Sequence, residues 1–249
     1  MPIPPHERFI CIDCEATGLD TQTDQIVEVA VALFDMKKVH ATFESLINPQ
    51  CEIPETSIMI HHITQDMVAE KPTIDQVLEN ILSLIGKHII VGHNVAYDIA
   101  LIANAAAKLG VSTTINENRF IDTVRLARHY GDSPKNSLEM LRAHFNIPPE
   151  GAHRAMNDVI VNMEVFRRLS TFYKSTQHLF ETLSKPVLLK TMPLGPHKGR
   201  PMREVPFNYL VWMLNKDFDQ DLMYSVKTEI NRRKKGDLFQ QAGNPFLDL

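Results

Sequence analysis

The segment FICIDCEATG (residues 9–18) decides the fold. Its first eight residues are mostly apolar and predict a buried strand, which the pair Thr17-Gly18 closes. Asp13 and Glu15 are two residues apart, so on a strand both side chains lie on the same face. Two neighbouring carboxylates repel each other unless a cation neutralises them, and oxygen ligands suit magnesium or manganese. The strand therefore predicts one wall of a divalent-metal site, with a strand end carrying two solvated acids as the alternative.

The segments that follow predict an α/β fold. Three strands come in quick succession and predict an antiparallel meander, after which helical and strand patterns alternate. The result is a mixed sheet, an antiparallel meander plus parallel strands, flanked by helices. The predicted strands are residues 9–16, 25–36, 40–49, 88–92 and 119–123, and the predicted helices are 73–85, 97–109, 124–129, a helix capped by Asn136 and Glu139, and a long helix from the Pro148–Gly151 break to about 173.

Composition changes near residue 180, where we expect a domain boundary. The prediction is a domain of residues 1–178, followed by a small helical module of residues 186–249 with a basic helix and a flexible tail. The module contains nine basic and five acidic residues between Lys198 and Lys235. This excess is compatible with binding the phosphate backbone of a strand, or with a solvated helix end. Tyr209 and Trp212, three residues apart, are predicted to pack in a core.

Two later motifs carry further candidate residues. Asp98 lies in HNVAYD at a helix start, and His153 and Asp158 lie in HRAMND at the start of the long helix. Five residues turn a helix by roughly 500°, so His153 and Asp158 would not share a face, and His153 is expected on the loop or first turn. Taken singly, Asp98 also fits an acid that complements a helix dipole, and His153 fits a capping or surface residue.

The motifs IDCEATGLD, IHHIT, HNVAYD, SLEML and HRAMND together resemble the DEDDh 3′→5′ exonucleases, over about residues 8–172. This family includes the epsilon subunit of DNA polymerase III, exonuclease X and RNase T. The resemblance implies an RNase H-like fold and release of nucleoside 5′-monophosphates from DNA 3′ ends in replication proofreading or DNA repair. The module after residue 185 resembles that of exonuclease X-like proteins.

The resemblance also implies roles for individual residues. Asp13 would bridge two Mg²⁺ or Mn²⁺ ions, Glu15 and Asp158 would complete the first, and Asp98 would hold the second through water. His153 would be the general base. The substrate-binding residues implied are Thr17, Gly18 and Leu19 at the terminal nucleotide, His61 near the scissile bond, and Asn94 beside the substrate or the metal-binding helix. His62 departs from the family's usual glycine, and Tyr97 replaces a commoner phenylalanine.

Composition excludes several classes of protein. The formal net charge is −4, so nucleic acid would be bound by a local site. Three cysteines are too few for a disulfide framework, and the sulfurs of Cys11 and Cys14 should point to opposite faces of their strand, which argues against a redox or zinc motif. No apolar run approaches a membrane span, so a cytoplasmic protein without membrane contact is expected.

Other functions and partners stay open at this point. One is an exoribonuclease of the RNase T or oligoribonuclease type, another a non-catalytic DNA-binding accessory module, and a third a phosphodiesterase acting on small nucleotides. Expected partners are single-stranded or frayed DNA 3′ ends, with a replicative polymerase subunit or a sliding clamp as candidates. The tail segment QAGNPF (residues 241–246) is loosely similar to ligands of bacterial clamps, with a disordered tail as the alternative.

Overall fold

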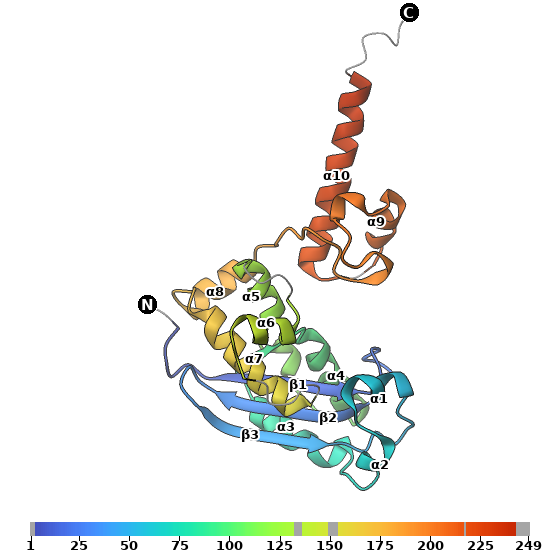
Figure 1. Cartoon of the computed structure of the whole chain (residues 1–249). Coiled ribbons are helices and arrows are strands. Elements are labelled where there is room, and N and C mark those ends of the chain that lie inside the picture. Colours follow the sequence, from blue (N-terminus) through green and yellow to red (C-terminus); the bar gives the residue numbers. More distant parts are fainter. Residues whose placement is uncertain (1–2, 132–135, 149–153, 217, 243–249) are drawn as a thin grey trace, which may run out of the picture. The chain divides into compact units, whose positions relative to one another are not determined.

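The computed structural model describes residues 3–131, 136–148, 154–216 and 218–242, and for 236–242 the backbone only. The chain forms two compact units, Met1–Leu183 and Ser184–Leu249 (Figure 1). The boundary between them lies inside the gap left by the predicted domains. The assignment of separate functions to residues 1–178 and 186–249 stays a prediction.

The first unit is built on one five-stranded mixed sheet in the order β3-β2-β1-β4-β5. β1, β2 and β3 pair antiparallel as a meander, and β4 and β5 run parallel to β1. The predicted fold class is therefore confirmed. β1 lies at the centre, so side chains on it reach the middle of either face. The strands are β1 (Phe9–Ala16), β2 (Ile26–Phe34), β3 (Val39–Leu46), β4 (Ile89–Gly92) and β5 (Phe120–Asp122).

Helices cover both faces of this sheet (Figure 1). One buried cluster joins the sheet to α5 and α7 through Phe9, Phe34 and Phe166, and a second joins it to α3 and α4. Cys11 belongs to the first cluster and Cys14 to the second, which confirms that their side chains point to opposite faces. The helices are α1 (Glu55–His61), α2 (Gln65–Val68), α3 (Ile74–Ile85), α4 (Ala96–Lys108), α5 (Thr123–Tyr130), α6 (Leu138–His144), α7 (Ala155–Ser170) and α8 (Thr176–Leu183).

The helix starts confirm one predicted cap and correct another. Thr73 and Gln76 form the predicted capping box of α3, in which each side chain binds the other residue's backbone N–H. At α6 the N-cap is Ser137 rather than Asn136, so that prediction is wrong by one residue. Three short helices, α1, α2 and α8, were not predicted from the sequence.

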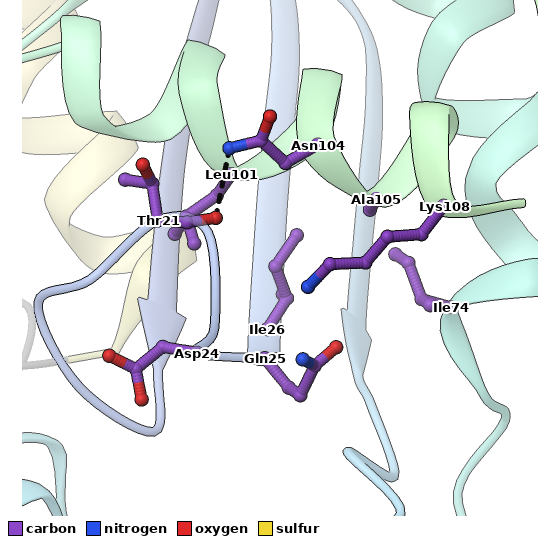
Figure 2. Close-up of a pocket in the computed structure, with 9 residues that line it drawn as sticks. All are labelled: Thr21, Asp24, Gln25, Ile26, Ile74, Leu101, Asn104, Ala105 and Lys108. Atoms are coloured by element: carbon purple, nitrogen blue, oxygen red, sulfur yellow. Dashed lines mark hydrogen bonds between the residues drawn. The ribbon is translucent and has the colours of Figure 1, made fainter.

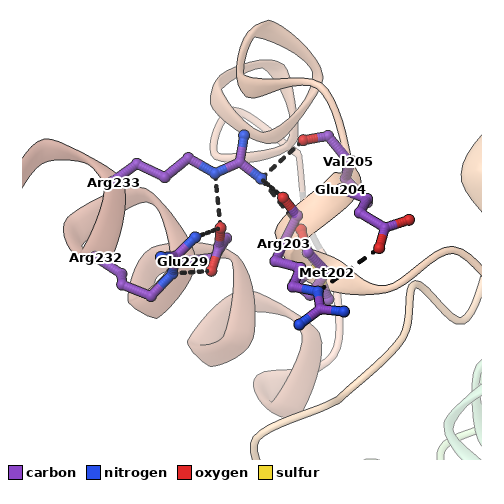
Figure 3. A network of polar contacts seen from close by, with 7 residues as sticks. All are labelled: Met202, Arg203, Glu204, Val205, Glu229, Arg232 and Arg233. Carbon is purple, nitrogen blue, oxygen red and sulfur yellow. Dashed lines mark hydrogen bonds and ion pairs between the residues drawn. The ribbon is translucent and has the colours of Figure 1, made fainter. Parts of the chain in front are cut away.

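The second unit has its own apolar core, to which α9 (Phe207–Met213) and α10 (Gln220–Ala242) both contribute side chains. Figure 3 shows a polar network that joins α10 to the segment of residues 202–205. Arg233 Nη2 donates to three carbonyl oxygens, at 3.3 Å on Met202, 3.0 Å on Arg203 and 2.9 Å on Val205. Arg232 and Arg233 also bind Glu229, and their hydrogen bonds lower the pKa of its carboxyl to about 2. These two arginines of the basic helix therefore stabilise the unit itself.

Trp212 corrects the prediction for this unit. Its side chain is 48% exposed, although it was expected in a core, whereas Tyr209 packs partly buried against the core. A spacing of three residues places both on neighbouring parts of one helix surface, but it does not say which way that surface faces.

Across the described ranges, none of the helices has both the length and the apolar character that crossing a bilayer requires. The clamp-like tail segment falls largely on residues 243–246, which lie outside the described residues.

Candidate active site

Three carboxylates converge on one face of the central strand. Asp13 and Glu15 are the two half-buried positions of β1, separated by the buried Cys14. α7 packs on β1 and β2 and brings Asp158, in its first turn, to the same place. Asp13, Glu15 and Asp158 each offer an oxygen, and these oxygens all lie within 4.8 Å of one another. Such a spacing allows all three to bind one ion.

Asp98 approaches the same strand from another element. It lies in the first turn of α4, which follows β4, the parallel neighbour of β1. The residue is 4% exposed, and its Oδ1 accepts a hydrogen bond from the backbone N–H of Cys14 at 2.8 Å. It is not one of the three closely spaced ligands. Its charge nevertheless acts on Asp13, as the pKa of that group shows.

The acids of this site hold their protons more tightly than isolated carboxyls. Burial, followed by the charges of Asp98, Glu15 and Asp158, raises the pKa of Asp13 well above its ordinary value. Burial and then Asp158 raise the pKa of Glu15 to about 7. Burial raises the pKa of Asp98 to about 8, although the hydrogen bond from Cys14 opposes the change. A cluster of this kind is costly when ionised, and a divalent cation with oxygen ligands removes that cost.

A buried ion pair holds the start of α7. Glu28 on β2 is fully buried and lies opposite Glu15 in the β1–β2 register. Arg154, the N-cap residue of α7, donates Nε at 2.9 Å and Nη2 at 2.6 Å to Glu28 Oε1. The N–H of Ala155 donates to Oε2 at 3.0 Å. The pair therefore fixes the first turn that carries Asp158.

Sequence reasoning missed Glu28, although a signal was available. It is the one acid in the strand IVEVAVALF, whose every residue is buried. A lone charge inside a fully apolar strand calls for a buried partner. The sequence does not say which of the chain's arginines supplies it.

We predict that Glu28→Gln weakens binding of Mg²⁺ to the candidate metal site by about 10–100-fold, the range for residues that orient metal ligands. The free energy of unfolding should also fall by about 2 kcal/mol, since Arg154 loses its bidentate partner but is half-exposed. Titration calorimetry and thermal melts measure both. Glu79→Gln, on the exposed face of α3, is the matched control. Unchanged Mg²⁺ affinity in a folded Glu28→Gln protein would refute the positioning role.

The loop of residues 17–25, between β1 and β2, presents one exposed apolar side chain. Thr17 is buried; its hydroxyl donates to Asp24 Oδ1 at 2.8 Å and accepts from the N–H of Gln25 at 3.0 Å. A Cβ added at Gly18 would come within 2.5 Å of Asp24 Oδ2, so a larger residue there would displace the Asp24 carboxylate. Leu19, next along the loop, is 89% exposed. The internal bonds fix the loop while Leu19 projects from it.

Helix α4 fastens this loop at two points. The hydroxyl of Tyr97 donates to the carbonyl oxygen of Gly18. Asn104 Nδ2 donates to the carbonyl oxygen of Thr21 at 2.9 Å, as Figure 2 shows. The hydroxyl of Tyr97 thus explains a tyrosine where phenylalanine was expected. Figure 2 also shows the residues that line a small pocket between the loop and α4, and none of the four carboxylates discussed above is among them. The pocket is separate from the candidate metal site.

Helix α1 carries His61 and contacts the same loop through Ser57. His61 is buried, and its Nδ1 accepts a hydrogen bond from the N–H of Ile63 at 3.0 Å; burial lowers its pKa. Ser57 Oγ donates to the carbonyl oxygen of Thr17 at 2.7 Å. His62 has a φ of 60°, the left-handed region that favours glycine. This conformation gives a physical reason for the family's glycine at the position.

Asn94 lies in a tight turn before α4. Its φ is 61°, and its N–H donates to Asp122 Oδ1 at 3.1 Å. Asp122 also caps α5 through Val124 and thereby ties the two helix starts together. Asn94 is exposed, as a residue beside a substrate would be. His153, the expected general base, lies outside the described residues.

Comparison with known proteins identifies the class. Residues 10–166 match the family model RNase_T, described as "Exonuclease". The chain therefore belongs to this exonuclease family, and both the predicted DEDD-type family and the RNase H-like fold are confirmed. Residues 181–227 match a second model, "Putative quorum-sensing-regulated virulence factor". The exonuclease X-type assignment of the C-terminal module is corrected accordingly, since this match is not specific to exonuclease X.

Individual relatives agree with this class. The chain is 33% identical over 163 residues to the PolC-type DNA polymerase III of Caldanaerobacter subterraneus subsp. tengcongensis, covering 65% of this chain and 11% of that protein. It is 29% identical to the DNA polymerase III epsilon subunit of Treponema pallidum, covering 74% and 87%. The structure of exonuclease X in complex with 5′-overhanging duplex DNA superposes with a TM-score of 0.56 at 25% identity, covering 70% and 99%. The chain thus spans only a small part of the PolC-type relatives.

Proposed function

We propose that the protein is a magnesium-dependent 3′→5′ exonuclease that removes nucleotides from DNA ends. One observation carries this proposal: carboxylate oxygens of Asp13, Glu15 and Asp158 lie within 4.8 Å of one another. They do so on the central sheet of a chain that belongs to an exonuclease family. The donor set consists of oxygens only, which fits Mg²⁺ or Mn²⁺. Because the chain belongs to an exonuclease family, the reaction is hydrolysis of a phosphodiester bond.

Each acid has a proposed role in holding two ions. Asp13, on which the charges of the other three acids act, would bridge them; Glu15 and Asp158 would bind the first, and Asp98 would hold the second through water. When bound, the ions supply charge that stabilises the attacking and leaving oxygens. His153 would take the proton from the attacking water. The water oxygen bonds to phosphorus as the bond from phosphorus to the 3′ oxygen breaks. The 3′ oxygen takes up a proton from solvent and becomes the new 3′-hydroxyl of the strand, and a nucleoside 5′-monophosphate leaves.

The terminal nucleotide would be met by the fixed loop of residues 17–25. Leu19 projects into solvent and suits a contact with the last base, while the backbone of Thr17 and Gly18 lies beside it. His61 and Asn94 complete the proposed substrate-binding residues. Because Tyr97 and Asn104 hold the loop, it is ready to receive a strand end without large rearrangement.

DNA is the proposed substrate because the relatives named above include DNA polymerase III subunits and a DNA-bound exonuclease. Trimming of 3′ ends in proofreading or repair is the proposed role. A polymerase subunit or a sliding clamp is the proposed kind of protein partner.

Hydrolysis of matched single-stranded DNA and RNA oligomers, side by side with Mg²⁺, tests the substrate. We expect kcat/KM for DNA to exceed that for RNA by at least about tenfold, a difference of about 1.4 kcal/mol in transition-state binding. Initial rates on 3′-labelled strands of identical sequence provide the comparison. A preference for RNA would replace this proposal with an exoribonuclease of the RNase T or oligoribonuclease type.

A further inference from the structure

The two units carry opposite charge. Residues 1–183 contain 15 Lys and Arg against 23 Asp and Glu, a formal net charge of −8, whereas residues 184–249 contain 11 against 7, a net charge of +4. A polyanionic strand is repelled by the first and attracted by the second. If the substrate is DNA, a second unit that binds the strand offsets the repulsion between the strand and the acidic catalytic unit.

An aromatic ladder lies on the surface of this second unit. The rings of His197 and Tyr209 have centroids 4.6 Å apart, and those of Tyr209 and Trp212 are 5.3 Å apart. Trp212 is 48% exposed, so about half of its side chain is accessible to solvent. Tyr209 is partly buried and anchors the ladder to the core. An exposed, supported ring of this kind is a platform on which a base can stack.

One cation lies beside the ladder, and two more are close to it in the sequence. Lys216 Nζ lies 5.4 Å from the centre of the Trp212 ring. Lys198 and Arg200 are exposed on the same loop as His197, within three residues of it. Arg232 and Arg233, in contrast, bind Glu229 within the unit. A cation next to an exposed aromatic ring suits the phosphates and bases of a single strand.

We propose that the surface formed by His197, Lys198, Arg200, Tyr209, Trp212 and Lys216 is a binding site for single-stranded DNA. A base stacks on Trp212, and Lys216, Lys198 and Arg200 contact the phosphates. This proposal rests on the proposed function for its choice of DNA. It gives the C-terminal unit a task that the family of the first unit does not assign: retention of the strand while the 3′ end is consumed.

The tryptophan itself provides the direct test, because Trp212 is the only one in the chain. The full-length protein, kept with chelator so that no hydrolysis occurs, is titrated with a 20-residue thymidine oligonucleotide. Stacking on Trp212 should quench most of the tryptophan emission, and the quench should weaken steeply with added salt. Binding by fluorescence anisotropy without any change in tryptophan emission would overturn the proposal.

Variants separate this site from the catalytic one. Trp212→Ala and Lys216→Ala should each weaken binding of the 20-mer by about 10-fold, and Trp212→Phe should restore most of the loss. Both alanine variants should raise KM for the long strand while kcat stays unchanged. Tyr224→Ala and Lys227→Ala, which alter an aromatic ring and a cation exposed on α10, are the matched controls and should bind normally.

The outcomes distinguish the two proposals. If Trp212→Ala binds the 20-mer as tightly as the unmodified chain, the surface is not a DNA site. If binding depends on Trp212 but no DNA is hydrolysed, the inference holds and the proposed function fails. An RNA strand of the same length, bound more tightly than DNA, would overturn the choice of ligand.

Discussion

Asp13→Asn is expected to lower kcat for DNA hydrolysis by roughly 10³-fold or more, while making the metal-free protein more stable. The charges of Asp98, Glu15 and Asp158 all act on Asp13, and Asp13 is the proposed bridge between two ions, so its loss removes a ligand from both. The same change removes one of several mutually repelling carboxyls, which raises the free energy of unfolding by about 1 kcal/mol, or about 2–4 °C in melting temperature.

A lower kcat together with a higher free energy of unfolding distinguishes the loss of a metal ligand from misfolding, because a misfolded variant would lose activity and stability together. Asp75→Asn, an exposed acid in the first turn of α3, is the matched control and should leave kcat unchanged. Kinetics with Mg²⁺ and thermal melts with chelator provide the two measurements. An Asp13→Asn protein that retains more than about a tenth of the kcat would not fit a bridging ligand.

The second prediction concerns the joint effect of metal and pH on stability. Addition of 10 mM Mg²⁺ should raise the melting temperature by about 5 °C or more at pH 8.5 and by less than half of that at pH 6. The reason is competition between protons and ions for the same oxygens. At pH 6, Glu15 and Asp98, with pKa values raised to about 7 and about 8, hold protons that an ion must displace.

The sign follows from the protons bound by each state. Between pH 4 and 8 the folded, metal-free protein binds protons at Glu15 and Asp98 that the unfolded chain does not, so its stability falls as pH rises. Burial lowers the pKa of His93 to about 4, which acts in the opposite sense below about pH 6.5. That contribution is the same with and without Mg²⁺ and cancels in the difference.

Thermal melts across this range, with and without Mg²⁺, supply the data. The Asp13→Asn variant serves as the control, because its smaller cluster should show a much weaker response to the ion. A melting-temperature increase that is equal at pH 6 and pH 8.5 would mean that Mg²⁺ binds elsewhere than at these carboxyls.

Much of the fold was predictable because its strands carry clear signals. β1 is a buried apolar run with two acids at period two, and α3 begins with a capping box. Local pattern and tertiary structure agree at these places. The short helices α1 and α2 were missed, and with them Ser57, whose hydroxyl supports the loop after β1. A helix of one or two turns gives too few residues for a periodic pattern.

The contacts that organise the site are non-local, so the sequence alone does not reveal them. Glu28 and Arg154 are 126 residues apart, and Tyr97 bonds to Gly18 across 79. Trp212 was predicted to be buried because large apolar side chains are buried on average, whereas it is 48% exposed on the surface proposed to bind DNA.

The central claim, that the carboxyl cluster of β1, α4 and α7 directs metal-dependent removal of nucleotides from a 3′ end, has one direct test. A single DNA strand labelled at its 5′ end in one tube and at its 3′ end in another is incubated with Mg²⁺, with chelator, or with the Asp13→Asn protein. We predict a descending ladder from the 5′-labelled strand, immediate release of labelled 5′-mononucleotide from the 3′-labelled strand, and neither product in the other two reactions. Release that begins at the 5′ end, or that continues undiminished in chelator, would contradict it.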